Sequence, residues 1–312
     1  MRKFGSNTLA GVTLFALCVA AQAEGINFAD QGKLLATGGV SQVEGAGGGG
    51  LAPWALITGY GTRDSIGANV HYTRVNTNDQ SLATYGVAVG VFDRVELSFA
   101  NQEFKFHEGL LSMKGQTRIR QDIVGVKVKL FGDIVYDQDT WMPQVAIGAM
   151  HKKNKGLDIP VLGVTGFSPK NLGAKSDDGT DVYVSATKLY LSESILANVT
   201  LRATKANQFG LLGFGGDRHD SYRLQPEASL AYLFTRKLAL GVEYRAKPHN
   251  LIADNEGAAY DIFLAYFPTR NFSLTLAYVD LGTIGKEIAK SFGASDYGSR
   301  QRGGYLSAQV GF

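Results

Sequence analysis

The sequence has 312 residues, of which 39 are glycine and one is cysteine, and its formal net charge at pH 7 is +3. Glycine is nearly twice as frequent as the roughly 7% of average proteins, but it shows no three-residue period, which excludes a collagen-like chain. The 45% of hydrophobic residues excludes a disordered protein. The small, evenly spread charge excludes a nucleic-acid partner.

Residues 1–23 have the pattern of a secretory signal peptide. Basic residues precede an apolar run over 9–21, and Ala21-Gln22-Ala23 supplies a small-x-small cleavage site. Cys18 lies inside the apolar run, so the mature chain has no thiol for a disulfide or a metal site. We therefore expect an exported protein, located in the periplasm or the outer membrane.

The next predicted unit, 24–52, is rich in glycine, which supplies eight of the twenty residues from 31 to 50. Residues 45–50 formally contain G-x-G-x-x-G, but no helix follows to direct its N-terminus at a phosphate. A turn or a closely packed backbone is the better interpretation. We predict that 24–52 supplies the first strand of a barrel, over 33–44, or a partial plug within the barrel.

From residue 53 onward the dominant period is two, over segments of about ten residues, as in the tilted strands of membrane barrels. In 124–130, for example, apolar residues alternate with Gly125, Lys127 and Lys129, so one face is apolar and the other carries charge. Strands are predicted over 53–60, 66–73, 81–91, 95–100, 124–130, 141–150, 181–191, 197–204, 222–234, 238–246, 259–267, 272–278 and 305–312. With 33–44, the count is about fourteen, within a range of about 12 to 16.

Short links between these strands alternate with long ones, as periplasmic turns and extracellular loops do in outer-membrane barrels. The predicted fold is therefore all-β: a transmembrane antiparallel up-and-down β-barrel over 53–312. Apolar pairing across two hairpins places Glu227 opposite Arg245 and Tyr266 opposite Phe272.

The last strand has apolar residues at every second position, including Leu306, Val310 and the terminal Phe312. This ending resembles the signal that the barrel-assembly machinery reads on outer-membrane proteins. Together with the signal peptide, it predicts a location in the outer membrane of a Gram-negative bacterium. The expected partners are outer-membrane lipid, the assembly machinery and a small solute.

Several stretches of the sequence have a distinctive composition. They are GKLLATGGV (32–40), PWA (53–55), GYGTRD (59–64), YGVAVG (85–90), DRVELS (93–98), SATK (185–188), ANQFGLLGFGGD (206–217) and AYVDLG (277–282). These stretches resemble a family of exported proteobacterial proteins, the domain-of-unknown-function family 3034. The resemblance covers essentially the whole mature chain. It implies an outer-membrane β-barrel and carries no established activity or site residues.

The faces assigned to the lumen carry five basic and three acidic residues. They are Glu96, Lys127, Lys129, Arg202, Arg223, Glu227, Glu243 and Arg245. In a water-filled lumen the basic excess would favour anions. Alternatively, these residues pair with one another and fill the interior.

An apolar cluster within a predicted outer loop is a second candidate site. It consists of Phe209, Leu211, Leu212 and Phe214. An exposed apolar segment usually binds something or folds inward. We predict a lumen constriction or a surface for a hydrophobic solute; the loop could instead cover the barrel mouth.

No residues are assigned to catalysis, to a metal or to a cofactor. The five histidines are scattered, and His219-Asp220-Ser221 has triad residue types whose sequence adjacency disfavours a triad. The predicted function is an outer-membrane pore or uptake channel for small solutes, anionic or amphipathic. One alternative is a closed structural or adhesion barrel whose outer loops bind a partner; a second is an outer-membrane hydrolase.

Overall fold

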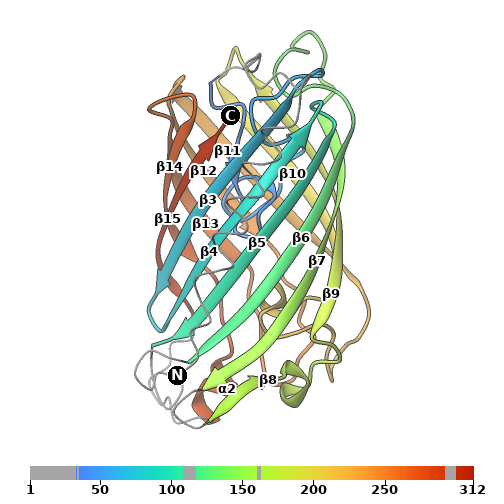
Figure 1. Ribbon diagram of the computed structural model, residues 1–312, viewed down its shortest axis with the longest axis vertical. Helices are drawn as coiled ribbons and strands as arrows, with labels where there is room; N and C mark the ends of the chain where they lie inside the picture. Colours follow the sequence, from blue (N-terminus) through green and yellow to red (C-terminus); the bar gives the residue numbers. More distant parts are fainter. Residues whose placement is uncertain (1–32, 34, 108–116, 160–162, 292–299) are drawn as a thin grey trace, which may run out of the picture.

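The computed structural model describes residues 33, 35–107, 117–159, 163–291 and 300–312, and it contains a closed antiparallel barrel of twelve strands (Figure 1). The wall strands are β3 (Ile66–Thr77), β4 (Gln80–Val91), β5 (Val95–Phe106), β6 (Arg118–Phe131), β7 (Gln144–Ile159), β9 (Asp178–Tyr190), β10 (Ile195–Thr204), β11 (Arg223–Thr235), β12 (Leu238–Arg245), β13 (Ala259–Tyr266), β14 (Phe272–Asp280) and β15 (Arg302–Gly311). The first wall strand, β3, pairs with the last, β15, which closes the sheet. The predicted all-β antiparallel barrel is confirmed.

A few short elements accompany the wall. They are β1 (Val40–Ser41), β2 (Gly47–Gly48), β8 (Val164–Phe167), the 3₁₀ turns η3 (Pro169–Leu172) and η4 (Asn207–Gly210), and the helix α2 (Lys286–Ser291). Strand β8 extends the sheet at the edge of β7. Across the described residues, no helix combines the length and the hydropathy needed to cross a membrane.

The expected number of about fourteen strands was too high, because 33–44 and 53–60 do not belong to the wall. Every residue from 38 to 61 is buried, whereas a wall strand would expose every second side chain to lipid. This segment, called the plug below, lies inside the barrel, where Figure 1 shows it as the blue chain. The wall begins at Ile66 rather than at 53. The predicted signal peptide, 1–23, lies outside the described residues.

The outer surface of the wall is apolar, as the alternation predicts. Exposed side chains of successive strands include Val70, Leu97, Val126, Leu201 and Leu230. Aromatic side chains stand exposed toward the strand ends, among them Phe92, Phe234, Tyr266 and Tyr278. An apolar belt with aromatic borders is the surface that a transmembrane barrel presents to lipid.

The observed strand register agrees with the register predicted from the sequence in one hairpin and differs from it in another. Glu227 pairs with Arg245, as predicted. Tyr266, however, pairs with Leu274 rather than with Phe272. The turn is longer than expected, and its first residue, Phe267, is buried. A shift of two residues preserves the inward and outward faces.

The two ends of the barrel differ. One end, the short-turn end, carries the links 92–94, 191–194 and 236–237 together with Phe312. The opposite end, the long-loop end, carries the long links, including 205–222 and 246–258, and lies away from the C-terminus in Figure 1. The plug leaves the lumen at the short-turn end, where the Tyr60 N–H donates to the Phe312 carbonyl at 3.2 Å.

Candidate functional site: the plugged lumen

The plug is a compact turn-rich segment with only one small ladder, in which Val40 pairs with Gly48. Its glycines allow the backbone to approach the wall closely. A Cβ atom at Gly49 would lie 2.0 Å from a carboxylate oxygen of Glu243 in the wall, and within the plug one at Gly48 would lie 2.4 Å from the Ala52 carbonyl. The glycine run therefore serves close packing, one of the two interpretations offered from its sequence.

Side chains of the wall, rather than a neighbouring strand, form hydrogen bonds with the peptide groups of the plug. The Glu96 carboxylate accepts hydrogen bonds from the N–H groups of Gly47 and Thr58, both at 2.9 Å. The Lys127 ammonium donates to the carbonyls of Gly47 at 2.8 Å and Trp54 at 3.1 Å. The two wall residues also form a buried ion pair at 3.1 Å. Buried peptide groups need such partners, and here the lumen wall provides them.

Further contacts of this type follow the plug along its length. Thr187 Oγ1 accepts from the Ala55 N–H at 2.8 Å, and Gln144 Nε2 donates to the Ala55 carbonyl at 2.6 Å. Gln102 Nε2 donates to the Val43 carbonyl at 2.8 Å. Polar contacts therefore hold the plug backbone against the wall, while plug side chains such as Val43 and Leu56 pack in apolar clusters with wall residues.

A row of charges crosses five neighbouring wall strands at the level of the plug. From β7 through β9, β10 and β11 to β12, its members are Lys152, Asp181, Arg202, Glu227 and Arg245, so the sign alternates from strand to strand. All are buried. Lys152 Nζ lies 2.6 Å from an Asp181 oxygen, and Arg202 Nε lies 2.5 Å from a Glu227 oxygen. The row begins and ends with a cation, so three positive charges face two negative ones.

Glu44 of the plug completes this row. Its carboxylate contacts Arg245 through both terminal nitrogens, Nη1 at 2.9 Å and Nη2 at 3.0 Å, and Arg202 Nη1 at 3.2 Å. The Lys152 ammonium is a third partner. We call these six residues the ion layer. With Glu44 in place, its three cations face three carboxylates, and its formal charge is zero.

An inward-folded loop covers the ion layer from the long-loop end. The predicted cluster of Phe209, Leu211, Leu212 and Phe214 is buried in this loop. The Phe209 ring lies over the Arg245 guanidinium, with 4.1 Å between its centroid and Cζ, and the Phe209 carbonyl accepts from Lys152 Nζ at 3.3 Å. Leu211 packs with Val43 and Leu51 of the plug in one apolar cluster.

Gln208 anchors this loop in a strained conformation. Gln208 and Phe209 both have positive φ angles, 47° and 64°, which non-glycine residues rarely adopt. Gln208 Nε2 donates to Asp254 at 2.8 Å, its N–H donates to Glu256 at 2.9 Å, and its side-chain oxygen accepts from Lys247 at 2.6 Å. Burial raises the pKa values of both carboxyls and lowers the pKa of Lys247 to about 8. The 246–258 loop thus holds the cover in place.

The short-turn end of the lumen contains an apolar cavity of about 430 Å³, called the apolar chamber below. Plug and wall both contribute to its lining, which includes Val40, Trp54, Leu189, Ala231, Leu233 and Phe263. Its apolar lining differs from the charged surface of the ion layer. The chamber can receive a hydrocarbon group without leaving polar atoms unpaired.

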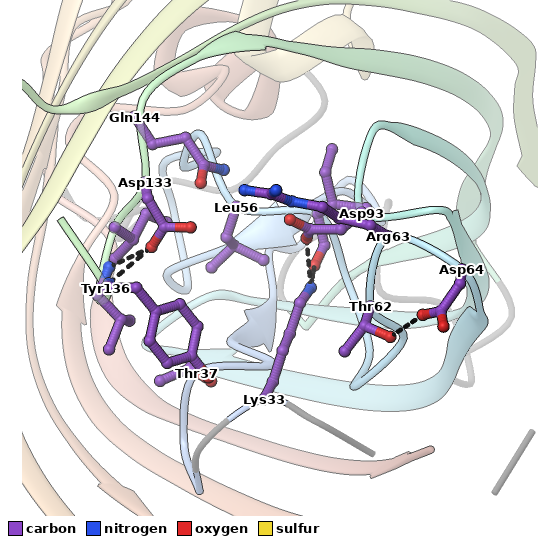
Figure 2. A pocket seen from close by; sticks show the side chains of 13 residues that line it. Lys33, Thr37, Leu56, Thr62, Arg63, Asp64, Asp93, Asp133, Tyr136 and Gln144 are labelled. Atoms are coloured by element: carbon purple, nitrogen blue, oxygen red, sulfur yellow. Dashed lines mark hydrogen bonds and ion pairs between the residues drawn. The ribbon is translucent and has the colours of Figure 1, made fainter. Parts of the chain in front are cut away.

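A polar pocket of about 600 Å³ adjoins the chamber and shares Thr37, Leu56 and Ile134 with it. Figure 2 shows Lys33 and Asp93 meeting in this pocket, and their side chains form an ion pair at 2.7 Å. Together the two spaces present apolar and charged surfaces side by side.

The predicted lumen residues occupy different parts of the interior. Glu96, Lys127, Arg202, Glu227, Glu243 and Arg245 are buried beside the plug. Lys129 pairs with Asp93 at 2.5 Å toward the short-turn end, and Arg223 is half-buried at the start of β11. Leu306, Val310 and Phe312 are exposed on the outer face, and their role in assembly stays a prediction.

Sequence reasoning missed Glu44, Lys152 and Asp181. Lys152 stands in a run of polar residues, His151-Lys152-Lys153-Asn154, where both faces of the strand are polar and no alternation marks the inner one. Glu44 lies in the glycine-rich segment, which has no period at all. Only the excess of basic residues on the other inward faces hinted at a missing acid.

The histidines proposed for a hydrolase do not form a site with serine. His71 is buried, and neither of its ring nitrogens has a hydrogen-bond partner within the described parts of the chain. His219 is exposed on the 205–222 loop. His107 Nε2 does lie 3.0 Å from Ser81 Oγ, but Ser81 is 2% exposed, whereas a nucleophile must reach its substrate. Among the described residues, no cluster of His, Cys, Asp and Glu could hold a metal ion.

The closed antiparallel wall, its apolar belt and its polar lumen define a porin-like transmembrane β-barrel. The chain belongs to the family described as "Protein of unknown function (DUF3034)", whose model matches residues 37–309 and thus includes the plug. No curated protein matches the sequence.

Several solved barrels are similar in structure. The NanC porin is 9% identical, with 78% of this chain and 98% of that chain covered and a TM-score of 0.48. Omp33 of Acinetobacter baumannii is 12% identical (79% and 97% covered, TM-score 0.41). Outer membrane phospholipase A from Escherichia coli is 8% identical (81% and 94% covered, TM-score 0.39).

Proposed function

We propose that the protein is a solute-uptake channel in the outer membrane of a Gram-negative bacterium, and that its plug moves to admit small anionic or amphipathic molecules. Its apolar belt suits a bilayer, and a closed β-barrel satisfies every backbone hydrogen bond of its wall within the membrane. The observation that carries the proposal is the ion layer between plug and wall.

A buried ion network is a poor way to fill a permanently closed barrel. Removing charges from water costs several kcal/mol per ion, and apolar packing of similar volume is often equally stable or more so. Charges on the wall are advantageous when the lumen is at times filled with water, because they are then hydrated. The polar plug contacts support the same conclusion, since water can replace each hydrogen bond when the plug moves.

The apolar chamber and the polar pocket support the solute class. An amphipathic molecule entering at the short-turn end, or leaving there, could place its hydrocarbon part in the chamber and its polar group beside Lys33. A purely hydrophilic pore would have no use for an apolar lining of this kind.

The filled lumen also favours a second candidate, a closed structural or adhesion barrel whose outer loops bind a partner. In that case the plug is a permanent core and never leaves the wall. The two functions therefore differ in one physical event, the displacement of the plug.

A reversible crosslink tests this event in the full-length chain. Asn69 Nδ2 of β3 donates to Thr58 Oγ1 of the plug, so Thr58→Cys with Asn69→Cys would join plug and wall. Cys18, the one cysteine of the sequence, is replaced by serine so that it cannot interfere. As a matched control, Thr73→Cys with Ser307→Cys joins two wall strands whose hydroxyls lie 2.7 Å apart.

Flux of small organic anions into proteoliposomes is the measurement. We expect oxidation to abolish flux in the Thr58/Asn69 variant and reduction to restore it, while the control pair conducts in both states. If folded wild-type barrels show neither solute flux nor conductance, the transport function is wrong and the closed barrel is favoured. If flux persists while the plug is crosslinked to the wall, the proposal that the plug moves to admit solutes is wrong.

A further inference from the structure

The ion layer has the geometry of a carboxylate-binding site whose occupant is part of the same chain. Arg245 contacts the two oxygens of Glu44 with its two terminal nitrogens, the paired geometry by which guanidinium groups recognise carboxylates. Arg202 and Lys152 approach the same carboxylate from two other strands. Three cations on three strands thus converge on one carboxylate.

The wall holds these cations in place without help from the plug. Asp181 contacts both Lys152, at 2.6 Å, and Arg202, at 3.3 Å. Glu227 contacts Arg202 at 2.5 Å and Arg245 at 3.4 Å. Because each cation has a wall carboxylate as a neighbour, the site persists when Glu44 leaves. Its net charge then becomes +1, so an anion is the ligand that restores neutrality.

The surroundings of Glu44 add an apolar side to the site. The Phe209 ring covers Arg245, and the Met150 sulfur lies 3.7 Å from Arg202 Nη1. A carboxylate attached to a short hydrocarbon chain would therefore find both its charge and its methylene groups accommodated.

From these contacts we infer that Glu44 is an internal substitute for the carboxylate of a transported solute. Solutes with a carboxylate compete with Glu44 for Arg245, Arg202 and Lys152, and this competition releases the plug. The inference rests on the proposed uptake function and names its substrate class, carboxylate anions of small organic molecules.

Plug release can be followed independently of transport. Ser41 is completely buried in the plug, where its hydroxyl donates to Gln309 at 2.8 Å. Ser41→Cys, in the full-length chain with Cys18→Ser, therefore reports plug displacement through its rate of labelling by a polar maleimide. The probes are glutarate, its neutral analogue glutaramide, and KCl at matched ionic strength. At ten times its dissociation constant for the released state, glutarate should raise the labelling rate about tenfold, because a ligand that binds only this state multiplies its population by one plus the ratio of ligand concentration to Kd. Glutaramide and KCl should leave the rate unchanged.

Single substitutions test whether the response of the labelling rate to glutarate depends on the ion layer. Arg245→Gln should remove the response to glutarate, whatever its basal rate. Lys129→Gln, which alters a lumen lysine paired with Asp93 and not with Glu44, should retain it. Glu44→Gln leaves the wall intact and should raise labelling without any ligand.

Three outcomes would overturn the inference: an equal response to glutaramide or KCl, a preserved response in Arg245→Gln, or unchanged basal labelling in Glu44→Gln. None of these outcomes changes the result of the crosslinking experiment, in which flux is measured with the plug joined to the wall. A transport function would then stand, with another substrate class. Conversely, a glutarate response without any flux would retain the carboxylate site and reject uptake.

Discussion

The ion layer and the apolar chamber are both bounded by the plug, but they are filled in opposite ways. In the ion layer, each charged group has at least one oppositely charged neighbour within 3.4 Å, and the six residues are buried together. In the chamber, Val40, Trp54 and Phe263 border about 430 Å³ of space that no side chain fills.

This difference follows from what each kind of surface requires. A buried charge without a partner is costly, so the ion layer must be complete whenever water is absent. An apolar surface has no such requirement and can border a cavity, losing only contact energy. Ion pairs therefore fix the position of the plug at the ion layer. At the apolar chamber, the plug leaves a cavity that a ligand can occupy.

The largest expected effect is in the ion layer. Arg202→Met leaves Glu44, Asp181 and Glu227 short of a cation and should lower the free energy of unfolding by about 3–5 kcal/mol. Urea unfolding of the barrel in lipid measures this loss. Arg302→Met is the control, because Arg302 pairs with Asp280 on an exposed surface and should matter by about 1 kcal/mol or less. Equal losses in both variants would contradict the importance of the ion layer.

A smaller effect is expected in the chamber. Ala231 lines it, so Ala231→Phe should occupy part of the space and weaken binding of an apolar fluorescent probe, N-phenyl-1-naphthylamine, about tenfold. Ala228→Phe, on the lipid-facing side of the same strand, should leave probe binding unchanged. If the chamber were packed, Ala231→Phe would instead destabilise the barrel by about 1–3 kcal/mol.

The smallest effect concerns the loop that covers the ion layer. The raised pKa values of Asp254 and Glu256 mean that the closed loop prefers their protonated forms, so their contribution to closure is complete at low pH and is lost as pH rises through those pKa values. The lowered pKa of Lys247, about 8, has the opposite effect. The closed loop becomes more stable as the pH rises from about 8 to 10.5, the ordinary pKa of lysine.

Hydrogen exchange of residues 206–214, corrected for intrinsic rates, measures this closure. Protection should fall by about 1 kcal/mol or less between pH 5 and pH 7.5. Glu256→Gln should flatten the profile. Protection that increases over this interval would contradict the assignment.

Much of the wall could be predicted from the sequence because its pattern is local. Leu97 and Val126 face lipid, and Glu96 and Lys127 face the lumen, as the two-residue period requires. The pairing of Glu227 with Arg245 followed from the same period and a short turn. The register around Tyr266 did not, because the two-residue period fixes which side chains share a face and not how long the turn between two strands is.

A partial plug was one of two predictions for 24–52, but which of the two is right, and that the buried segment extends over 38–61, could not be predicted in this way. Residues 33–44 and 53–60 have strand-like composition, and nothing local distinguishes a strand that faces lipid from a segment surrounded by a wall on all sides. For the same reason Glu44 carried no signal, since its three cations come from positions 152, 202 and 245.

The sequence by itself determined a transmembrane barrel, its two faces and several of the charged residues that face its interior, because alternation along each strand encodes the contrast between lipid and lumen. Only the tertiary structure decided that the lumen is closed, that Lys152 and Asp181 join a row of alternating charges, and that Glu44 completes it. The physical reason is that charge pairing between the plug and five separate strands depends on distance in space, which the order of residues along the chain does not record.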